Sequence, residues 1–266
     1  MAVSEQRKQS KVGLLLRGWR ERRRLSQVDL ANRAGVSARH LSFLETGRAM
    51  PSRAMVLRLA EQLEVPLRDR NPLLLAAGYA PAYEQKPLAD PAMGPVLGAV
   101  KQILSGHDPY PALVVDGEWN LVDTNRSFAL FTEGVAPELL EPPVNALRLV
   151  LHPKGMAPGI VNLGVWRAKL LGRLSRRAAA DPRLGPLYEE LLAYPCDQEE
   201  PELDVPGLGD ICIPLQLRRG DHELSFFATL ATFGTPRDIT VAELIIESFF
   251  PADEATAEAV RGLNRS

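Results

Sequence analysis

The first 80 residues carry apolar positions three or four apart, in short runs separated by serine, glycine and proline. This period predicts amphipathic helices, and Ser26, Ser37 and Ser52 each stand where a helix N-cap is expected. Gly35 and Gly47 follow such runs, in the place of a left-handed residue that ends a helix. The pattern therefore predicts five short helices, over residues 12–24, 27–33, 38–46, 52–63 and 71–77.

From Pro109 onward, several segments change to the alternating pattern of strands. Residues 112–116 and 119–123 predict a hairpin around a two-residue turn at Gly117-Glu118. Three more strands are expected over 211–218, 222–233 and a segment that starts at 239 or 243 and ends at 249. The second half is thus predicted to be an α+β domain with an antiparallel sheet of about five strands.

A helical block separates the two groups of strands. Its helices are expected over residues 125–131, 145–152, 159–180 and 187–192. In the longest one, the spacing of Trp166, Leu170, Leu171 and Leu174 predicts an apolar inner face and a basic outer face.

The stretch between the two halves is rich in proline, with Pro81, Pro87, Pro91 and Pro95 around a short apolar helix over 96–104. Such a composition indicates a linker with a connecting helix. We expect a helical head over residues 1–80, the linker over 81–108 and the second domain over 109–266, with a boundary near residue 85.

The net charge of -2 hides an asymmetry between these halves. Residues 1–80 hold 15 of the 31 basic and 7 of the 33 acidic residues, a net charge of +8, which leaves -10 for the remainder. A basic module joined to an acidic one suggests nucleic acid as a partner, although small helical segments are often basic.

Residues 25–65 contain two helices joined by a tight turn at Gly35, which is the arrangement of a helix-turn-helix. Residues 12–78 resemble the Xre/Cro family of DNA-binding domains. The resemblance rests on the pieces LSQ, LA, AGVS, LSxLE, GR, PS and LxxLAxxLxV, in this order. It implies an all-α, five-helix head that binds double-stranded DNA. We expect a homodimer on a palindromic operator, because two-fold symmetric proteins match two-fold symmetric half-sites.

The second helix of the motif should read the bases. Val36, Leu41 and Leu44 are expected to face the core, which turns Arg39 outward as a bidentate partner for guanine. Phe43 either meets a thymine methyl or packs on the fourth helix. The residues expected at DNA are Gln27, Ser37, Ala38, Arg39, His40, Ser42, Phe43, Thr46 and Arg48.

The resemblance implies more specific roles for some positions. Gln27, Thr46 and Arg48 should bond phosphates, while Arg20 and Glu45 should form a partly buried ion pair that ties the first helix to the third. The arginines at 17, 22, 23 and 53 either attract phosphates without regard to sequence or form a solvated basic face.

The second half resembles the PAS-like ligand-binding domain of MmyB-like transcription regulators. The resemblance rests on ALVVDGEWNLVDTNRSFALF, on the pair His152-Pro153 and on ELSFFATLATFGTPRDITVAELIIESFFPADEAT. It implies a pocket for a fatty acid or a similar lipid-like effector.

Large side chains at core periods are compatible with such a pocket, although residue by residue they are more often part of a filled core. The candidate apolar lining residues are Trp119, Phe128, Phe131, Trp166, Leu170, Phe227 and Leu230; the candidates for a polar head are His152, Asn162 and Arg167.

Other function classes lack their signatures. Four histidines and two cysteines show no metal-ligand spacing, so we expect no metal and no cofactor beyond the effector. No nucleophile-elbow, zinc-protease, phosphate-loop or dinucleotide-binding pattern occurs, which argues against an enzyme. No apolar run is long enough to span a bilayer, and we expect a cytoplasmic protein. The hypothesis is a ligand-responsive DNA-binding regulator; the alternative is a regulator whose second domain serves only oligomerisation or protein interaction.

Overall fold

The computed structural model describes residues 10–201 and 212–263, and the chain divides into two units. The first comprises the chain up to Pro87 together with Thr235–Ala242, and the second comprises Leu88–Gly234 with Glu243–Ser266. Each unit is described by itself below.

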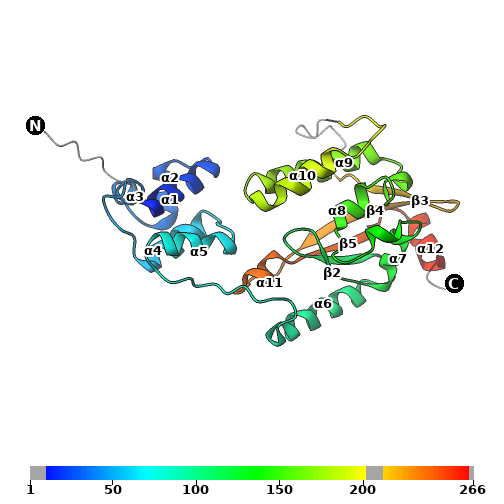
Figure 1. Cartoon of the computed structure of the whole chain (residues 1–266), viewed down its shortest axis with the longest axis horizontal. Coiled ribbons are helices and arrows are strands. Elements are labelled where there is room, and N and C mark those ends of the chain that lie inside the picture. Colours follow the sequence, from blue (N-terminus) through cyan, green and yellow to red (C-terminus); the bar gives the residue numbers. More distant parts are fainter. Residues whose placement is uncertain (1–9, 202–211, 264–266) are drawn as a thin grey trace, which may run out of the picture. The chain divides into compact units, whose positions relative to one another are not determined.

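The first unit contains five helices (Figure 1). They are α1 (Lys11–Arg22), α2 (Gln27–Ala34), α3 (Ala38–Glu45), α4 (Arg53–Gln62) and α5 (Leu67–Ala76). The expected N-caps are present, because the hydroxyls of Ser26, Ser37 and Ser52 accept bonds from the amides three residues on. Local side-chain capping therefore sets the starts of α2, α3 and α4.

One helix start was predicted wrongly. The fifth helix was expected over residues 71–77. The structure begins α5 at Leu67, with Pro66 in the cap position and Pro72 inside the helix. The leucines at 73 and 74 are fully buried in the core of this unit, so tertiary packing holds a helix that proline chemistry alone would shorten.

The second unit holds a five-stranded antiparallel sheet in the order β2-β1-β5-β4-β3. Its strands are β1 (Ala112–Val115), β2 (Leu121–Thr124), β3 (Leu215–Arg219), β4 (His222–Ala231) and β5 (Ile245–Pro251). The last strand lies between β1 and β4, so both ends of the domain sequence meet in the middle of the sheet. The predicted α+β domain with an antiparallel sheet of about five strands is confirmed.

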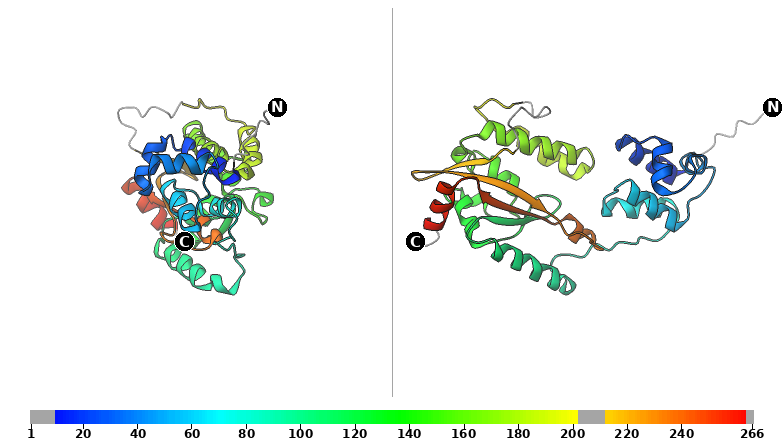
Figure 2. Two further views of the ribbon diagram at one scale, coloured as in Figure 1. Left: turned by 90° about the vertical axis from the view of Figure 1, so that its left-hand side faces the viewer. Right: turned by 180° about the vertical axis from the view of Figure 1, so that it is seen from behind.

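Helices cover both faces of this sheet, as Figures 1 and 2 show. The helices of this unit are α6 (Gly94–Gly106), α7 (Ala129–Thr132), α8 (Ala146–Leu151), α9 (Leu163–Ala178), α10 (Gly185–Leu192) and α12 (Glu254–Leu263); α11 (Ile239–Glu243) spans the boundary between the units. Short 3-10 helices lie at Pro91–Met93, Arg126–Phe128, Pro137–Leu139, Ala157–Gly159 and Pro182–Leu184.

The two sheet faces have separate cores. Val100 and Leu104 of α6 pack against Val114 and Ile246 on one face. The opposite face, called the inner face below, carries the larger core with α8, α9 and α10. This inner core contains Trp119, Phe131 and Phe226, which are among the largest fully buried side chains.

Several boundaries of the second unit differ from the sequence predictions. The last predicted strand is divided, with α11 before β5, because Asp238 caps a short helix through bonds to the amides of Thr240 and Val241. Strand β4 ends at Ala231 rather than at residue 233. Residue 211 of the predicted third strand lies outside the described residues. Helix α12, which contacts β4 and β5, was not predicted.

The segment that follows α5 forms hydrogen bonds at two places with other residues of the first unit. The Asn71 side chain accepts bonds from the amides of Ala82 and Tyr83 and donates one to the Tyr83 carbonyl at 2.7 Å. Further on, the amide of Lys86 donates to Asp238 at 3.0 Å, and the Thr240 hydroxyl donates to the carbonyl of Lys86 at 2.6 Å. We call these bonds around residues 82–86 the linker clasp.

Candidate nucleic-acid interface and ligand cavity

The turn between α2 and α3 has the geometry of a helix-turn-helix. Gly35 ends α2 with a φ of 64°, a left-handed conformation that glycine adopts without strain. The next amide, of Val36, bonds back to the carbonyl of Ala31 at 2.9 Å, and Ser37 then caps α3. The two helices are thus joined by a turn that needs no long-range contact to form.

Helix α3 presents a distinct outer face. Its Leu41 and Leu44 are fully buried, while Arg39 is exposed and Phe43 is half-buried. The guanidinium of Arg39 lies 5.4 Å from the centre of the Phe43 ring, and that of Arg48 lies 5.6 Å from it. A half-buried aromatic side chain with two guanidinium groups near its ring suits a surface that meets phosphates and base edges.

The other residues expected at DNA lie on α3, close to its two ends, or at the start of α2. Ser37, Thr46 and Arg48 are exposed, and Ala38, His40 and Ser42 are half-buried on α3 or at its start. Gln27 is half-buried and donates its amide to Glu45 Oε2 at 2.8 Å. This hydrogen bond to the buried Glu45 carboxylate therefore fixes the position of the Gln27 side chain.

Behind this face lies an ion pair between α1 and α3. Arg20 donates from Nε and Nη2 to the two oxygens of Glu45, at 2.7 and 3.0 Å, and from Nη1 to the carbonyl of Leu25 at 2.8 Å. Glu45 is 1% exposed, so its charge depends on Arg20 and Gln27 for compensation. The hydrogen bond that Arg20 donates to Glu45 raises the pKa of Arg20, which keeps the guanidinium charged.

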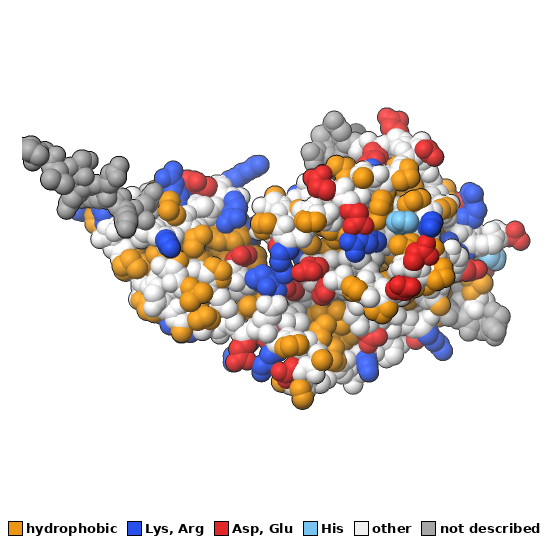
Figure 3. Space-filling model, in the orientation of Figure 1, with side chains coloured by type: hydrophobic (Ala, Val, Ile, Leu, Met, Phe, Trp, Pro, Cys, Tyr) orange, Lys and Arg blue, Asp and Glu red, His pale blue; other side chains and the backbone are white. Residues whose placement is uncertain are grey.

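The remaining basic residues of the first unit differ in their surroundings. Arg23 donates to the carbonyls of Leu63 and Glu64, which gives hydrogen-bond partners to backbone groups at the end of α4. Arg17 pairs with Glu21 on the surface of α1, and Arg22 lies over the Trp19 ring. In Figure 3 basic side chains are visible along the edge of this unit that carries α1 and α2.

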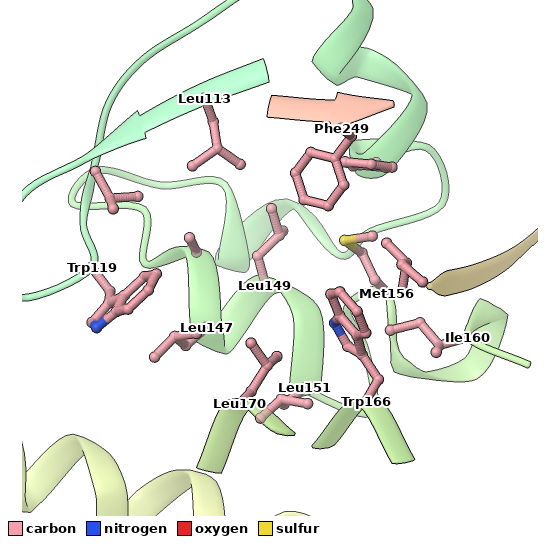
Figure 4. Close-up of a cluster of buried hydrophobic side chains, with 14 of the residues drawn as sticks. Leu113, Trp119, Leu147, Leu149, Leu151, Met156, Ile160, Trp166, Leu170 and Phe249 are labelled. Carbon is pink, nitrogen blue, oxygen red and sulfur yellow. The ribbon is translucent and has the colours of Figure 1, made fainter. Parts of the chain in front are cut away.

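The inner face of the sheet in the second unit contains a small cavity. Its volume is about 30 Å³, enough for one or two water molecules. Figure 4 shows the surrounding apolar side chains, which come from both strands and helices. The lining residues are Leu113, Trp119, Phe128, Phe131, Ala146, Leu147, Leu149, Val150, Met156, Trp166, Leu170, Leu215, Glu247 and Phe249.

A family model of the MmyB-like transcription regulator ligand binding domain matches residues 96–263, more than half of the chain. The chain belongs to the MmyB-like transcription regulators. A second model, of a helix-turn-helix domain, matches residues 11–73. The protein is therefore a DNA-binding transcription regulator with a ligand-binding domain.

Solved structures similar to this MmyB-like regulator match only part of it. The restriction-modification controller protein C.AhdI from Aeromonas hydrophila is 31% identical over 23% of this chain and 92% of its own, with a TM-score of 0.22. The clp gene regulator ClgR from Corynebacterium glutamicum is 28% identical over 26% of this chain and 86% of its own, with a TM-score of 0.23. No curated protein matches the chain.

The cavity of the MmyB-like regulator brings together five of the seven apolar residues predicted to line it. Trp119, Phe128, Phe131, Trp166 and Leu170 line the space. Phe227 points to the opposite side of β4 from the buried Phe226, because side chains alternate along a strand. Leu230 lies on the inner side but is 46% exposed, at the end of β4.

The three residues predicted to hold a polar head are not among the cavity lining; each is engaged elsewhere in the protein. Arg167 is buried and bonds Glu200 and the carbonyl of Leu192. Asn162 bonds the backbone of residues 214 and 216. The His152 ring packs edge-on against Tyr194.

The polar side chains beside the cavity of the MmyB-like regulator were missed by sequence reasoning. Glu247 of β5 is 8% exposed and lines the space, and burial raises the pKa of its carboxyl. Lys169, Arg173 and Arg177 of α9 were expected on an outer face, yet burial lowers the pKa of all three. A lone acid within the apolar run IIESFF was the available signal for Glu247.

Among the described residues, no group of three or more His, Cys, Asp or Glu side chains is placed to hold a metal ion. The same part of the chain contains no helix with the length and apolar character needed to cross a membrane.

Proposed function

We propose that this regulator binds a palindromic operator as a homodimer and reads the bases with the outer face of α3. The observation that carries the proposal is the exposed Arg39 beside Phe43 and Arg48, on a helix whose opposite side is buried. Arginine forms bidentate bonds with guanine, and the aromatic ring meets a thymine methyl. Two such helices in a dimer would enter half-sites about one helical turn, or 34–36 Å, apart.

Footprinting of the full chain on the DNA around its own gene tests this proposal. Arg39→Ala should relax the preference for one base pair by about 1–3 kcal/mol, whereas Arg53→Ala, at an exposed arginine of α4, should leave base preference unchanged. If Arg39→Ala keeps an intact fold and an unchanged base preference, the proposal that α3 reads the bases is refuted.

For the second domain we propose that the cavity on the inner face takes a small hydrophobic, fatty-acid-like effector. The support is its lining, which contains a single ionisable side chain, Glu247, among apolar ones. A ligand of this class exceeds the present 30 Å³, so it must displace side chains and thereby favour another conformation of the domain. Native mass spectrometry of the purified full chain, followed by lipid extraction, tests for a bound acyl chain.

The small volume of the cavity also favours a second candidate function, in which this domain is a filled module for dimerisation or protein interaction. In that case no member of a lipid panel stabilises the protein, while the oligomeric state depends on the second domain. Thermal unfolding with and without the panel separates the two candidates.

A further inference from the structure

The linker that follows α5 is held by hydrogen bonds to the head. Asn71 of α5 bonds the backbone of residues 82 and 83, and Arg68 of the same helix donates to the side chain of Gln85 at 3.0 Å. A linker without such bonds samples many conformations and end-to-end distances. The bonds to α5 remove this freedom from the first residues of the linker.

The linker is also joined to a segment that lies much later in the chain, at the start of α11. The amide of Ile239 donates to the carbonyl of Glu84 at 2.8 Å. Lys86 adds two bonds, because its amide donates to Asp238 Oδ2 and its carbonyl accepts from the Thr240 hydroxyl. Oδ1 of the same Asp238 accepts from the amide of Thr240 at 2.8 Å, so one carboxylate caps α11 and holds the linker. Figure 1 shows the linker passing beside α11.

Both chain segments that meet in the linker clasp enter the second unit within a few residues. Leu88 follows Lys86 by two residues and packs against the core on the α6 face of the sheet. On the other side, Leu244 directly follows α11 and is fully buried in the same core. The next residue begins β5, which lies in the middle of the sheet. The linker clasp therefore leaves little chain between one fixed position and the next.

The length of chain that an open clasp would release sets a distance. Seven residues lie between residue 83, which Asn71 holds, and Pro91, where the next helix begins, and a flexible chain of this length spans roughly 13–16 Å. Along DNA, one added base pair moves a half-site by about 3.4 Å and turns it by about 34–36°. An open linker would thus let a head follow a half-site that is displaced by several base pairs.

We propose that the linker clasp fixes the half-site spacing of the operator that this regulator accepts. The inference rests on the proposed homodimer and adds a determinant of specificity that no base contact supplies. Each head reaches its half-site through its own linker, so the clasp limits the distance and the angle at which the two α3 helices bind. Asp238 and Thr240 act through Lys86 and are positioning residues.

Binding of the full chain to variants of the footprinted operator tests this role, with one or two base pairs inserted or removed between the half-sites. The wild type should lose about 100-fold in affinity at two base pairs, because its second head no longer reaches a half-site. Asp238→Asn with Thr240→Val removes both bonds to Lys86, while asparagine still caps α11 and valine keeps the branched shape. In this double variant the loss should shrink to less than about 10-fold.

The matched control carries the same two substitutions at residues that are bonded elsewhere. Asp253 caps α12 through the amide of Thr256 at 2.7 Å, and the hydroxyl of Thr229 on β4 donates to the carbonyl of Ser248 at 3.4 Å. Asp253→Asn with Thr229→Val should keep the wild-type dependence on spacing. An equally broadened dependence in this control would overturn the role of the clasp, since general loosening of the protein would then explain the effect.

The other outcomes separate this inference from the proposal on which it rests. A wild type that binds all spacings alike, or a clasp variant as selective as the wild type, overturns the spacing role and leaves the dimer and the reading by α3 in place. A footprint over a single half-site overturns the homodimer and the spacing role with it. If the double variant does not fold, Thr240→Val alone, which keeps the Asp238 cap, decides in the same way.

Discussion

The Arg20–Glu45 pair allows the stability of the head to be separated from its reading of DNA. Arg20→Met retains an unbranched stem but removes all three of the guanidinium's bonds, two to Glu45 and one to Leu25. Glu45 then keeps only the 2.8 Å bond from Gln27. Because the carboxylate is 1% exposed, water cannot replace the lost partner.

The expected size follows from this burial. Removing one partner of a buried pair costs about 3–5 kcal/mol, since the remaining charge is uncompensated. The double variant Arg20→Met with Glu45→Leu removes both charges and should recover most of that loss. Arg17→Met breaks the surface pair with Glu21, whose side chains are about half exposed, and should change stability little.

Hydrogen exchange of the full chain, followed by mass spectrometry of peptides from α1 and α3, measures the opening free energy of the head itself. The amides of both helices should lose protection together in Arg20→Met, with peptides of β4 and β5 unchanged. A loss below about 1 kcal/mol would refute the assigned burial cost. So would an altered operator preference at unchanged protection, because the pair would then act in recognition.

Two further predictions concern packing and pH. Gly13→Ala should destabilise the head by about 1–3 kcal/mol, because a Cβ there would lie 2.5 Å from the Glu45 carbonyl oxygen; Gly18→Ala, with open space, should stabilise it by about 0.5–1 kcal/mol. The Arg148 hydrogen bond lowers the pKa of Glu190, so the stability this pair gives is complete above the unfolded pKa and is lost as pH falls through the folded one. Glu190→Gln should flatten the decline in unfolding temperature between about pH 5 and pH 3.

Chemical denaturation checks the glycine pair, and a stable Gly13→Ala would show that α1 and α3 can separate slightly at this crossing. Thermal unfolding across the acid range checks Glu190. An identical pH slope in wild type and Glu190→Gln would mean that the bond to Arg148 adds nothing in solution.

The helix-turn-helix could be predicted because its signals are local. Ser26, Ser37 and Gly35 act on backbone groups within a few residues, so their roles are visible in sequence spacing. The start of α5 was predicted wrongly because burial of Leu73 and Leu74 depends on other helices. Propensity cannot anticipate such tertiary effects.

The basic side chains of α9 that lie over Trp119 and Trp166 were missed for a different reason. Helical periodicity assigns a basic residue to an outer face, but a long stem can lie along an aromatic ring with its charge half-buried. Arg173 does so on Trp119, a residue 54 positions earlier in the chain. Only the fold brings these two side chains together, and with them Glu247.

The linker clasp can form only late in the synthesis of the protein. Lys86 is bonded to Asp238 and Thr240, which follow it by 152 and 154 residues. A ribosome adding about 5–20 residues per second needs roughly 8–30 s to supply them. During that interval α1–α5 have already been synthesised, so the head can fold before the hydrogen bonds of the linker clasp form. A chain cut short before residue 235 would keep the helix-turn-helix but would lack Asp238 and Thr240, which bond Lys86 in the linker clasp.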